Sequence, residues 1–152
     1  WFARVHGEHP RTLAFMQRSG HFEFGLDRRP INLGDDRRVG QVVECWNAGD
    51  EVRGLAMYWD MVYVHLARLL ASDEQVRTAA LVVRFETLCH DPEGTLRAVF
   101  EHCGLSDAGP IVERRAAGIR HPTYYQHGFS AQELETIHDE TSATASLWGY
   151  AE

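Results

Sequence analysis

Apolar and polar positions recur with different spacings along the chain, and each spacing predicts a different element. Between residues 41 and 71 the apolar side chains fall mostly at three- and four-residue steps, as on one face of a helix. We expect one long helix there, or two helices broken near Gly49. The run from Ala79 to Phe85 has no polar residue before Arg84, which is typical of a strand buried on both faces of a parallel sheet.

Capping residues mark further helices in the second half of the chain. Asp91 precedes Pro92, which is suited to a first helical position, and Gly104 provides a stop. Ser130 is followed three residues later by Glu133, the signature of a capping box. The predicted helices cover residues 92–102, 110–117 and 131–145.

The first forty residues follow another pattern. Residues 1–6 read as a short strand, and Pro10 stands where a helix over residues 11–18 can begin. Glycine, aspartate and arginine dominate residues 19–40, which predicts an exposed loop. This loop is either a solvated insertion or a mobile flap over a ligand.

Together these elements predict an α/β fold with a parallel sheet and a helix-rich C-terminal portion. We expect residues 1–152 to form a single domain that is incomplete, with further strands upstream. The absence of a methionine before Trp1 agrees with that expectation. The hydrophobic content of 44% suits a globular core.

Charge and residue content exclude several kinds of chemistry. All 15 basic residues are arginines, so a lysine-containing phosphate loop and a Schiff-base lysine are excluded within the chain. A net charge of −7 argues against nonspecific nucleic-acid binding. No apolar run reaches the roughly 18 residues that a membrane span needs.

The cysteines and histidines do not form a recognisable metal motif. Cys89-His90 and His102-Cys103 are adjacent pairs, which lack the spacing of two to four residues that directs ligands at one ion. We therefore expect no metal. The odd number of cysteines argues against a disulfide framework and favours a reducing cytoplasm.

The stretch from Leu81 to Leu105 resembles a sulfotransferase pattern. It reads LVVRFETLCHDPEGTLRAVFEHCGL, similar to a buried strand ending in Arg-Tyr-Glu-Asp-Leu, a short loop, Asp-Pro, an amphipathic helix and Gly-Leu. The later residues Leu147-Trp-Gly-Tyr150 look like the Leu-Gly-Tyr ending of bacterial members. The resemblance implies a P-loop-like three-layer fold. It also implies transfer of a sulfuryl group from 3′-phosphoadenosine 5′-phosphosulfate to an acceptor hydroxyl or amine.

The resemblance also suggests positions that contact the substrates. Phe85 matches an aromatic residue that approaches the adenine, although it can equally fill a core. Arg120 and His121 fall nearest to the family's loop on the 3′-phosphate, where cations at a helix C-terminus are an equal explanation. Tyr58 and Trp59 can line an acceptor pocket, as the aromatic helix before this strand can in the family, or they can belong to a core.

The family's second nucleotide motif is matched less well. Aligned on Pro10, Glu8 and Met16 replace its phosphate-binding arginine and serine, whereas a shifted register gives Arg11 and Ser19 the required separation of eight residues. The phosphosulfate loop and the catalytic base of the family are expected upstream, so the catalytic residues are unknown. A noncatalytic α/β binding or scaffold domain, descended from the same fold, is the alternative.

Overall fold

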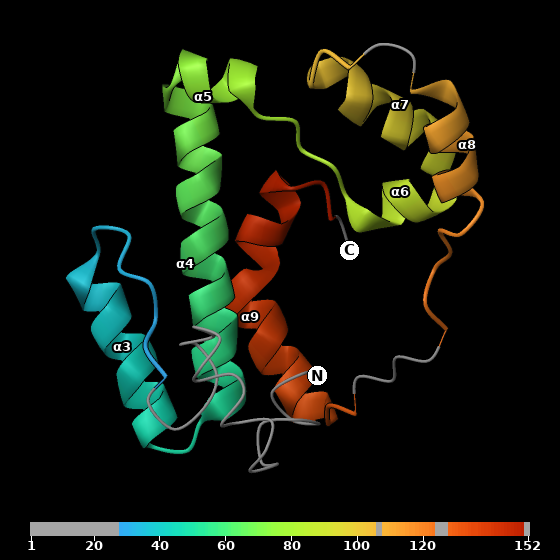
Figure 1. The fold of residues 1–152 in the computed structure, drawn as a ribbon. Coiled ribbons are helices and arrows are strands. Elements are labelled where there is room, and N and C mark those ends of the chain that lie inside the picture. The colour runs from blue at the N-terminus through green and yellow to red at the C-terminus, as the bar shows by residue number, and fades with distance from the viewer. Residues whose placement is uncertain (1–27, 106–107, 124–127, 151–152) are drawn as a thin grey trace. The chain divides into compact units, whose positions relative to one another are not determined.

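The computed structural model describes residues 28–105, 108–123 and 128–150, and every regular element within these ranges is an α-helix (Figure 1). The chain divides into two compact units, which we describe separately. Unit 1 comprises Trp1–Arg68 and His127–Glu152, and unit 2 comprises Leu69–Gln126. In chain order the helices are α3 (Asp36–Asn47), α4 (Glu51–Ser72), α5 (Glu74–Ala79), α6 (Phe85–His90), α7 (Pro92–His102), α8 (Gly109–Ala116) and α9 (Ala131–Leu147).

The predicted α/β fold with a parallel, P-loop-like sheet is wrong for the described part of the chain, which contains no strand. The run predicted as a buried strand lies between α5 and α6. Its side chains are well exposed, at 42% for Leu81, 52% for Val82 and 39% for Val83. A strand needs neighbouring strands to pair its backbone groups, and the described ranges contain none. The apolar run therefore has the composition of a strand without the partners that would make it one.

The helices predicted from caps are confirmed. Asp91 accepts a hydrogen bond from the Gly94 N–H at 3.0 Å, and α7 spans the predicted residues 92–102. Ser130 and Glu133 form the complete capping box of α9, which continues two residues beyond the predicted end at Ala145. These signals succeed because each acts within one turn of the backbone.

The break near Gly49 is also confirmed. α3 ends at Asn47 and α4 begins at Glu51, and Gly49 between them has φ +80°, a conformation that L side chains rarely adopt. At the other end of α3, the carboxylate of Asp35 caps the helix by accepting from the Arg38 N–H. Residues 28–35 lie outside the helices, so α3 begins within the predicted loop over residues 19–40.

Unit 1 places α4 beside both α3 and α9 (Figure 1). Val42 and Trp46 of α3 pack against Met57 of α4 to form its buried core. Gly54 permits this close approach, because a Cβ there would lie 2.4 Å from the Cδ1 atom of Trp46. Any larger residue at position 54 would require the Trp46 ring or the helices to shift.

A polar network connects α3, α4 and α9 within unit 1. The Arg38 guanidinium on α3 pairs with the Asp60 carboxylate on α4 at 2.9 Å. The other oxygen of this carboxylate accepts a hydrogen bond from the hydroxyl of Thr144 on α9, a residue only 2% exposed. Glu140 on α9 lies 3.8 Å from Arg38 and 3.7 Å from Arg53. One carboxylate thus joins α4 to both neighbouring helices.

Unit 2 is built around α7, which packs against α6 and α8. Val112 on α8 is its most buried apolar residue within the described ranges. The His102 ring, in the last turn of α7, lies with Nε2 2.9 Å from the carbonyl oxygen of Ala79. This contact ties the end of α7 to the end of α5.

The helices in the described ranges do not include one of sufficient length and apolar character to cross a membrane.

We predict that Thr144→Val lowers the free energy of unfolding of the chain by about 1.5–3 kcal/mol, the range for a hydrogen bond to a charged group. Valine keeps the shape of threonine but leaves one oxygen of the Asp60 carboxylate without its donor. Urea unfolding followed by circular dichroism measures the change.

Thr136→Val is the matched control, because the Thr136 hydroxyl donates only to the Gln132 carbonyl within α9. We expect it to change the free energy of unfolding by under about 0.5 kcal/mol. Equal losses for the two variants would show that the Thr144 hydroxyl has no special role between helices.

Candidate functional site

Phe85 is the first residue of α6 and carries the aromatic ring that is predicted to contact the adenine. Its side chain is 51% exposed. The ring centroid lies 6.2 Å from that of His121, and the two planes are inclined at 52°. Arg84, the N-cap residue, has an extended backbone, so α6 begins at Phe85. An adenine contact at Phe85 was predicted from the sequence. In the structure the Phe85 ring lies beside the ring of His121.

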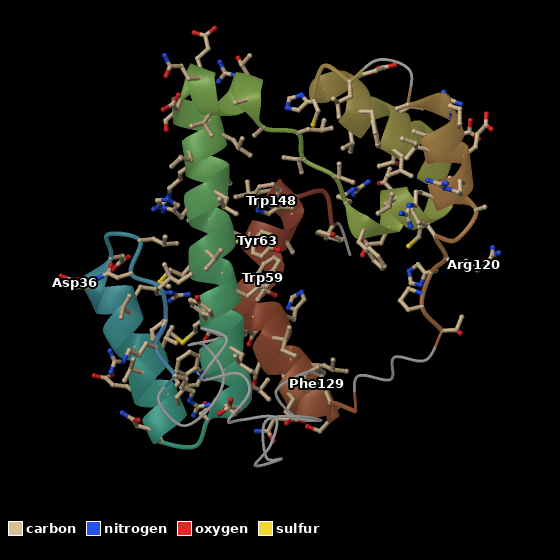
Figure 2. All side chains as sticks on the ribbon, viewed as in Figure 1. Asp36, Trp59, Tyr63, Arg120, Phe129 and Trp148 are labelled. Carbon is tan, nitrogen blue, oxygen red and sulfur yellow. The ribbon has the colours of Figure 1, made fainter. Side chains whose placement is uncertain are left out.

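His121 and Arg120 follow α8 in the chain. Nδ1 of His121 lies 3.4 Å from the carbonyl oxygen of Pro122. Arg120 is exposed, and Figure 2 shows its side chain directed away from the helices of unit 2. Arg120 is therefore a cation next in sequence to an imidazole that contacts an exposed aromatic ring.

The predicted acceptor residues Tyr58 and Trp59 do not form one surface. The Tyr58 ring meets the Trp46 ring edge-on, with centroids 6.1 Å apart, and its hydroxyl accepts from the Ile31 N–H at 3.3 Å. Neighbouring residues on a helix point about 100° apart, and Trp59 accordingly contacts different partners. Tyr58 thus packs against α3 and the segment that precedes it, and an acceptor contact stays a prediction for both residues.

Trp59 belongs to an aromatic ladder, by which we mean the three rings of Trp59, Tyr63 and Trp148. Trp59 and Tyr63 are stacked with centroids 4.4 Å apart, and Trp148 meets Tyr63 edge-on at 5.6 Å. The Trp148 indole N–H also donates to the Tyr63 carbonyl at 3.2 Å. Figure 2 shows the three side chains in succession along α4 and α9. These ring contacts join α4 to the residue that follows α9.

Arg11 and Ser19, predicted to hold the 3′-phosphate, lie outside the described residues. The same holds for Glu8 and Met16. Across the described ranges, no group of three or more His, Cys, Asp or Glu side chains is placed to hold a metal ion.

Two parts of this arrangement were missed by the sequence reasoning. Trp148 stands in the tail that suggested the family, but its contact with Tyr63 joins residues far apart in the chain. The pairing of Phe85 with His121 is likewise nonlocal. Helical spacing places Tyr63 beside Trp59 on one face of α4, so the contact between these two rings could be expected from the sequence. The other contacts depend on how helices and loops meet.

Cys45 is poorly suited to act as a nucleophile. Burial raises the pKa of its thiol, and the negative charge of Asp50 raises it further. The sulfur lies 3.7 Å from the Met57 sulfur, between α3 and α4. Because the thiolate is the reactive form, a raised pKa leaves Cys45 less reactive near neutral pH.

Phe85 and Arg120 are both exposed in unit 2, and the chemistry of their side chains indicates what they can bind. The open face of Phe85 can pack on a planar base, and the guanidinium of Arg120 can pair with a phosphate. Comparisons of the chain with protein-family models, curated proteins and solved structures gave no match. Function is therefore inferred from the residues themselves.

We predict that iodoacetamide alkylates Cys45 more slowly than the exposed Cys103 at pH 8. The raised pKa of Cys45 keeps more of its thiol protonated, and half-burial restricts access to it. As the pH rises from 8 to 9.5, the rate at Cys45 should continue to increase. Peptide mass spectrometry of the folded chain gives both rates, and a faster reaction at Cys45 would contradict the described packing.

Proposed function

We propose that the chain is part of a sulfotransferase that moves a sulfuryl group from 3′-phosphoadenosine 5′-phosphosulfate to an acceptor hydroxyl or amine. The proposal concerns activity and does not require the parallel sheet that the described residues lack. The single observation that supports it most is the exposed Phe85 ring beside His121, at the position where the sulfotransferase pattern has its adenine contact. The sequence likeness over residues 85–105 and at Leu147–Tyr150 also supports it, whereas the buried strand of the pattern is absent from the described ranges.

The chemistry of these side chains fits the nucleotide end of the donor. A purine can pack against Phe85, because aromatic faces stack favourably in an offset arrangement. A guanidinium is always charged and presents a fork of donors that matches a phosphate, so Arg120 suits the 3′-phosphate. When bound, the nucleotide supplies the sulfuryl group that passes to the acceptor, and adenosine 3′,5′-bisphosphate remains.

The residues of this chain contribute binding and orientation in the proposal. Phe85 and His121 hold the base, and Arg120 neutralises part of the phosphate charge. A cation is needed at the phosphate because the chain as a whole carries a net charge of −7, which repels an anionic nucleotide. The base that removes the acceptor proton is not assigned to any described residue.

We also propose that the protein works in a reducing cytoplasm. Cys45, Cys89 and Cys103 all carry free thiols. Disulfides are rare in that compartment, and free thiols persist there. The acceptor itself is not identified by these features.

We predict that adenosine 3′,5′-bisphosphate raises the melting temperature of the chain and binds it measurably in calorimetry. Phe85→Ala should weaken binding by about tenfold, since stacking on an aromatic ring contributes about 1–3 kcal/mol per base. Arg120→Ala should weaken it by a similar factor through loss of a charge-assisted hydrogen bond.

Arg37→Ala is the control for Arg120→Ala, because Arg37 is an exposed arginine on α3 in the other unit. It should leave affinity for the nucleotide unchanged. Loss of affinity in both arginine variants would indicate nonspecific attraction to charge rather than a site.

A radiolabelled donor separates catalysis from binding. Full-length protein that transfers labelled sulfate to acceptors supports the enzyme, whereas nucleotide binding with no transfer to any of a panel of hydroxyl and amine acceptors supports the noncatalytic alternative. If adenosine 3′,5′-bisphosphate does not bind or shift the melting temperature, the proposed function fails.

A further inference from the structure

We infer that residues 80–84 pair with the same residues of a second copy of the chain, as two antiparallel strands related by a two-fold axis at Val82. The inference goes beyond the proposed function, because it concerns assembly and does not involve the nucleotide. Three observations support it: the exposure of an apolar run, the backbone groups that this run leaves unpaired, and the match of the run to itself.

The run from Ala80 to Arg84 is an extended link between α5 and α6 (Figure 1). Its two end residues both have extended backbone angles, with ψ 136° at Ala80 and 137° at Arg84. The three side chains between them are apolar and well exposed, and two of them are valines, which favour strands. An exposed extended segment of this kind is a template for pairing with another chain.

The backbone of this segment determines which groups are available for pairing. The Ala80 N–H donates to the Val76 carbonyl at 2.9 Å, and the Arg84 carbonyl accepts from the Leu88 N–H at 3.0 Å. Among the described residues, no hydrogen bond involves the backbone of residues 81–83. These residues therefore offer their N–H and C=O groups to a partner strand.

Pairing about Val82 uses these free groups. In an antiparallel pair, residues that exchange both backbone hydrogen bonds alternate with residues that exchange none. Leu81 lies opposite Val83 of the second copy as a bonded pair, so the N–H of each donates to the carbonyl of the other. Val82 lies opposite its own counterpart without hydrogen bonds, where side chains come closest. The groups at Ala80 and Arg84 that already bond within the chain are not required.

The side chains of the segment also match themselves in this register. Successive side chains alternate between the two faces of a strand, so Leu81 and Val83 of both copies form one apolar face. On the other face, Val82 meets its counterpart and Arg84 lies opposite Ala80. Arg84 is the only charged residue of the segment, so no like charges meet across the pair. A second copy is thus complementary to the segment in hydrogen bonds, apolar contacts and charge.

Sedimentation velocity of the whole chain tests for the pairing. A strand pair is small beside a standard interface of roughly 20–30 residues a side, so we expect a weak dimer with a Kd on the order of tens of micromolar. Salt at about 0.15 M screens the repulsion between two copies of net charge −7. The wild-type chain should change from monomer to dimer as its concentration rises through this range. A monomer up to about ten times that Kd, or larger aggregates without a dimer, would overturn the inference.

Substitutions at Val82 test the two-fold register, because only in that register does this position face itself. Val82→Asp places two carboxylates opposite each other and Val82→Arg two guanidinium groups, so each should raise the Kd of the dimer by about tenfold. An equimolar mixture of the two variants should dimerise about fivefold more tightly than either alone, since opposite charges then meet. A mixture no tighter than its components would refute the register. Ile111→Asp, at a residue of α8 that is 45% exposed, is the matched control and should leave the Kd unchanged.

Amide hydrogen exchange followed by nuclear magnetic resonance distinguishes strand pairing from unspecific apolar association. As the wild-type concentration rises, the Leu81 and Val83 amides should exchange up to about fivefold more slowly, because exchange then requires the dimer to dissociate. The Val82 amide should keep its rate. Equal slowing of all three amides, or of none, contradicts the inference. Slow exchange at Leu81 and Val83 in a chain that stays monomeric would show that the same chain covers the run, which also refutes pairing between copies.

Discussion

The carboxylate of Asp60 is the group on which the arrangement of unit 1 most depends. It receives the Arg38 guanidinium from α3 on one oxygen and the Thr144 hydroxyl from α9 on the other. Arg38 and Asp60 are about one quarter and one fifth exposed, so their attraction is less screened than that of a surface pair. Because breaking such a pair leaves an uncompensated charge, the network favours one arrangement of α3, α4 and α9 over others.

Among the described residues, the buried apolar packing around this network is small. Val42, Trp46 and Met57 fill the space between α3 and α4, and Arg28 lies over the Trp46 ring at 4.8 Å from its centroid. The aromatic ladder stabilises the other end, where α9 meets α4. On α4, Asp60 follows Met57 of this core and stands between Trp59 and Tyr63 of the ladder, so the polar contact lies close to both regions.

The elements that could be predicted from sequence are those whose causes are local. The caps at Asp91 and Ser130, and the break at Gly49, act within a few residues, and the helices begin and end near the predicted positions. A strand is different, because its backbone hydrogen bonds come from other segments. The apolar run before Phe85 predicted a strand from composition alone, and the described part of the chain offers that run no partner.

The candidate site was predictable to the same extent. Phe85 was singled out through the resemblance of residues 81–105 to a sulfotransferase pattern, and the structure places its ring at the surface rather than in a core. Its contact with His121 joins distant parts of the chain, and so does the contact of Trp148 with Tyr63. The spacing of residues along the chain does not predict such nonlocal contacts. Tyr58 shows the reverse case, since an aromatic residue on a promising helix packs against Trp46 and hydrogen-bonds to the backbone.

We propose that Phe85, Arg120 and His121 in unit 2 contact the adenine nucleotide. Nuclear magnetic resonance titration of the isotopically labelled chain with adenosine 3′,5′-bisphosphate tests it most directly. The account predicts saturable shifts for the backbone amides around these residues, with those around Asp60 and Thr144 unchanged. Saturable shifts confined to unit 1, or no shifts at millimolar nucleotide, would contradict it.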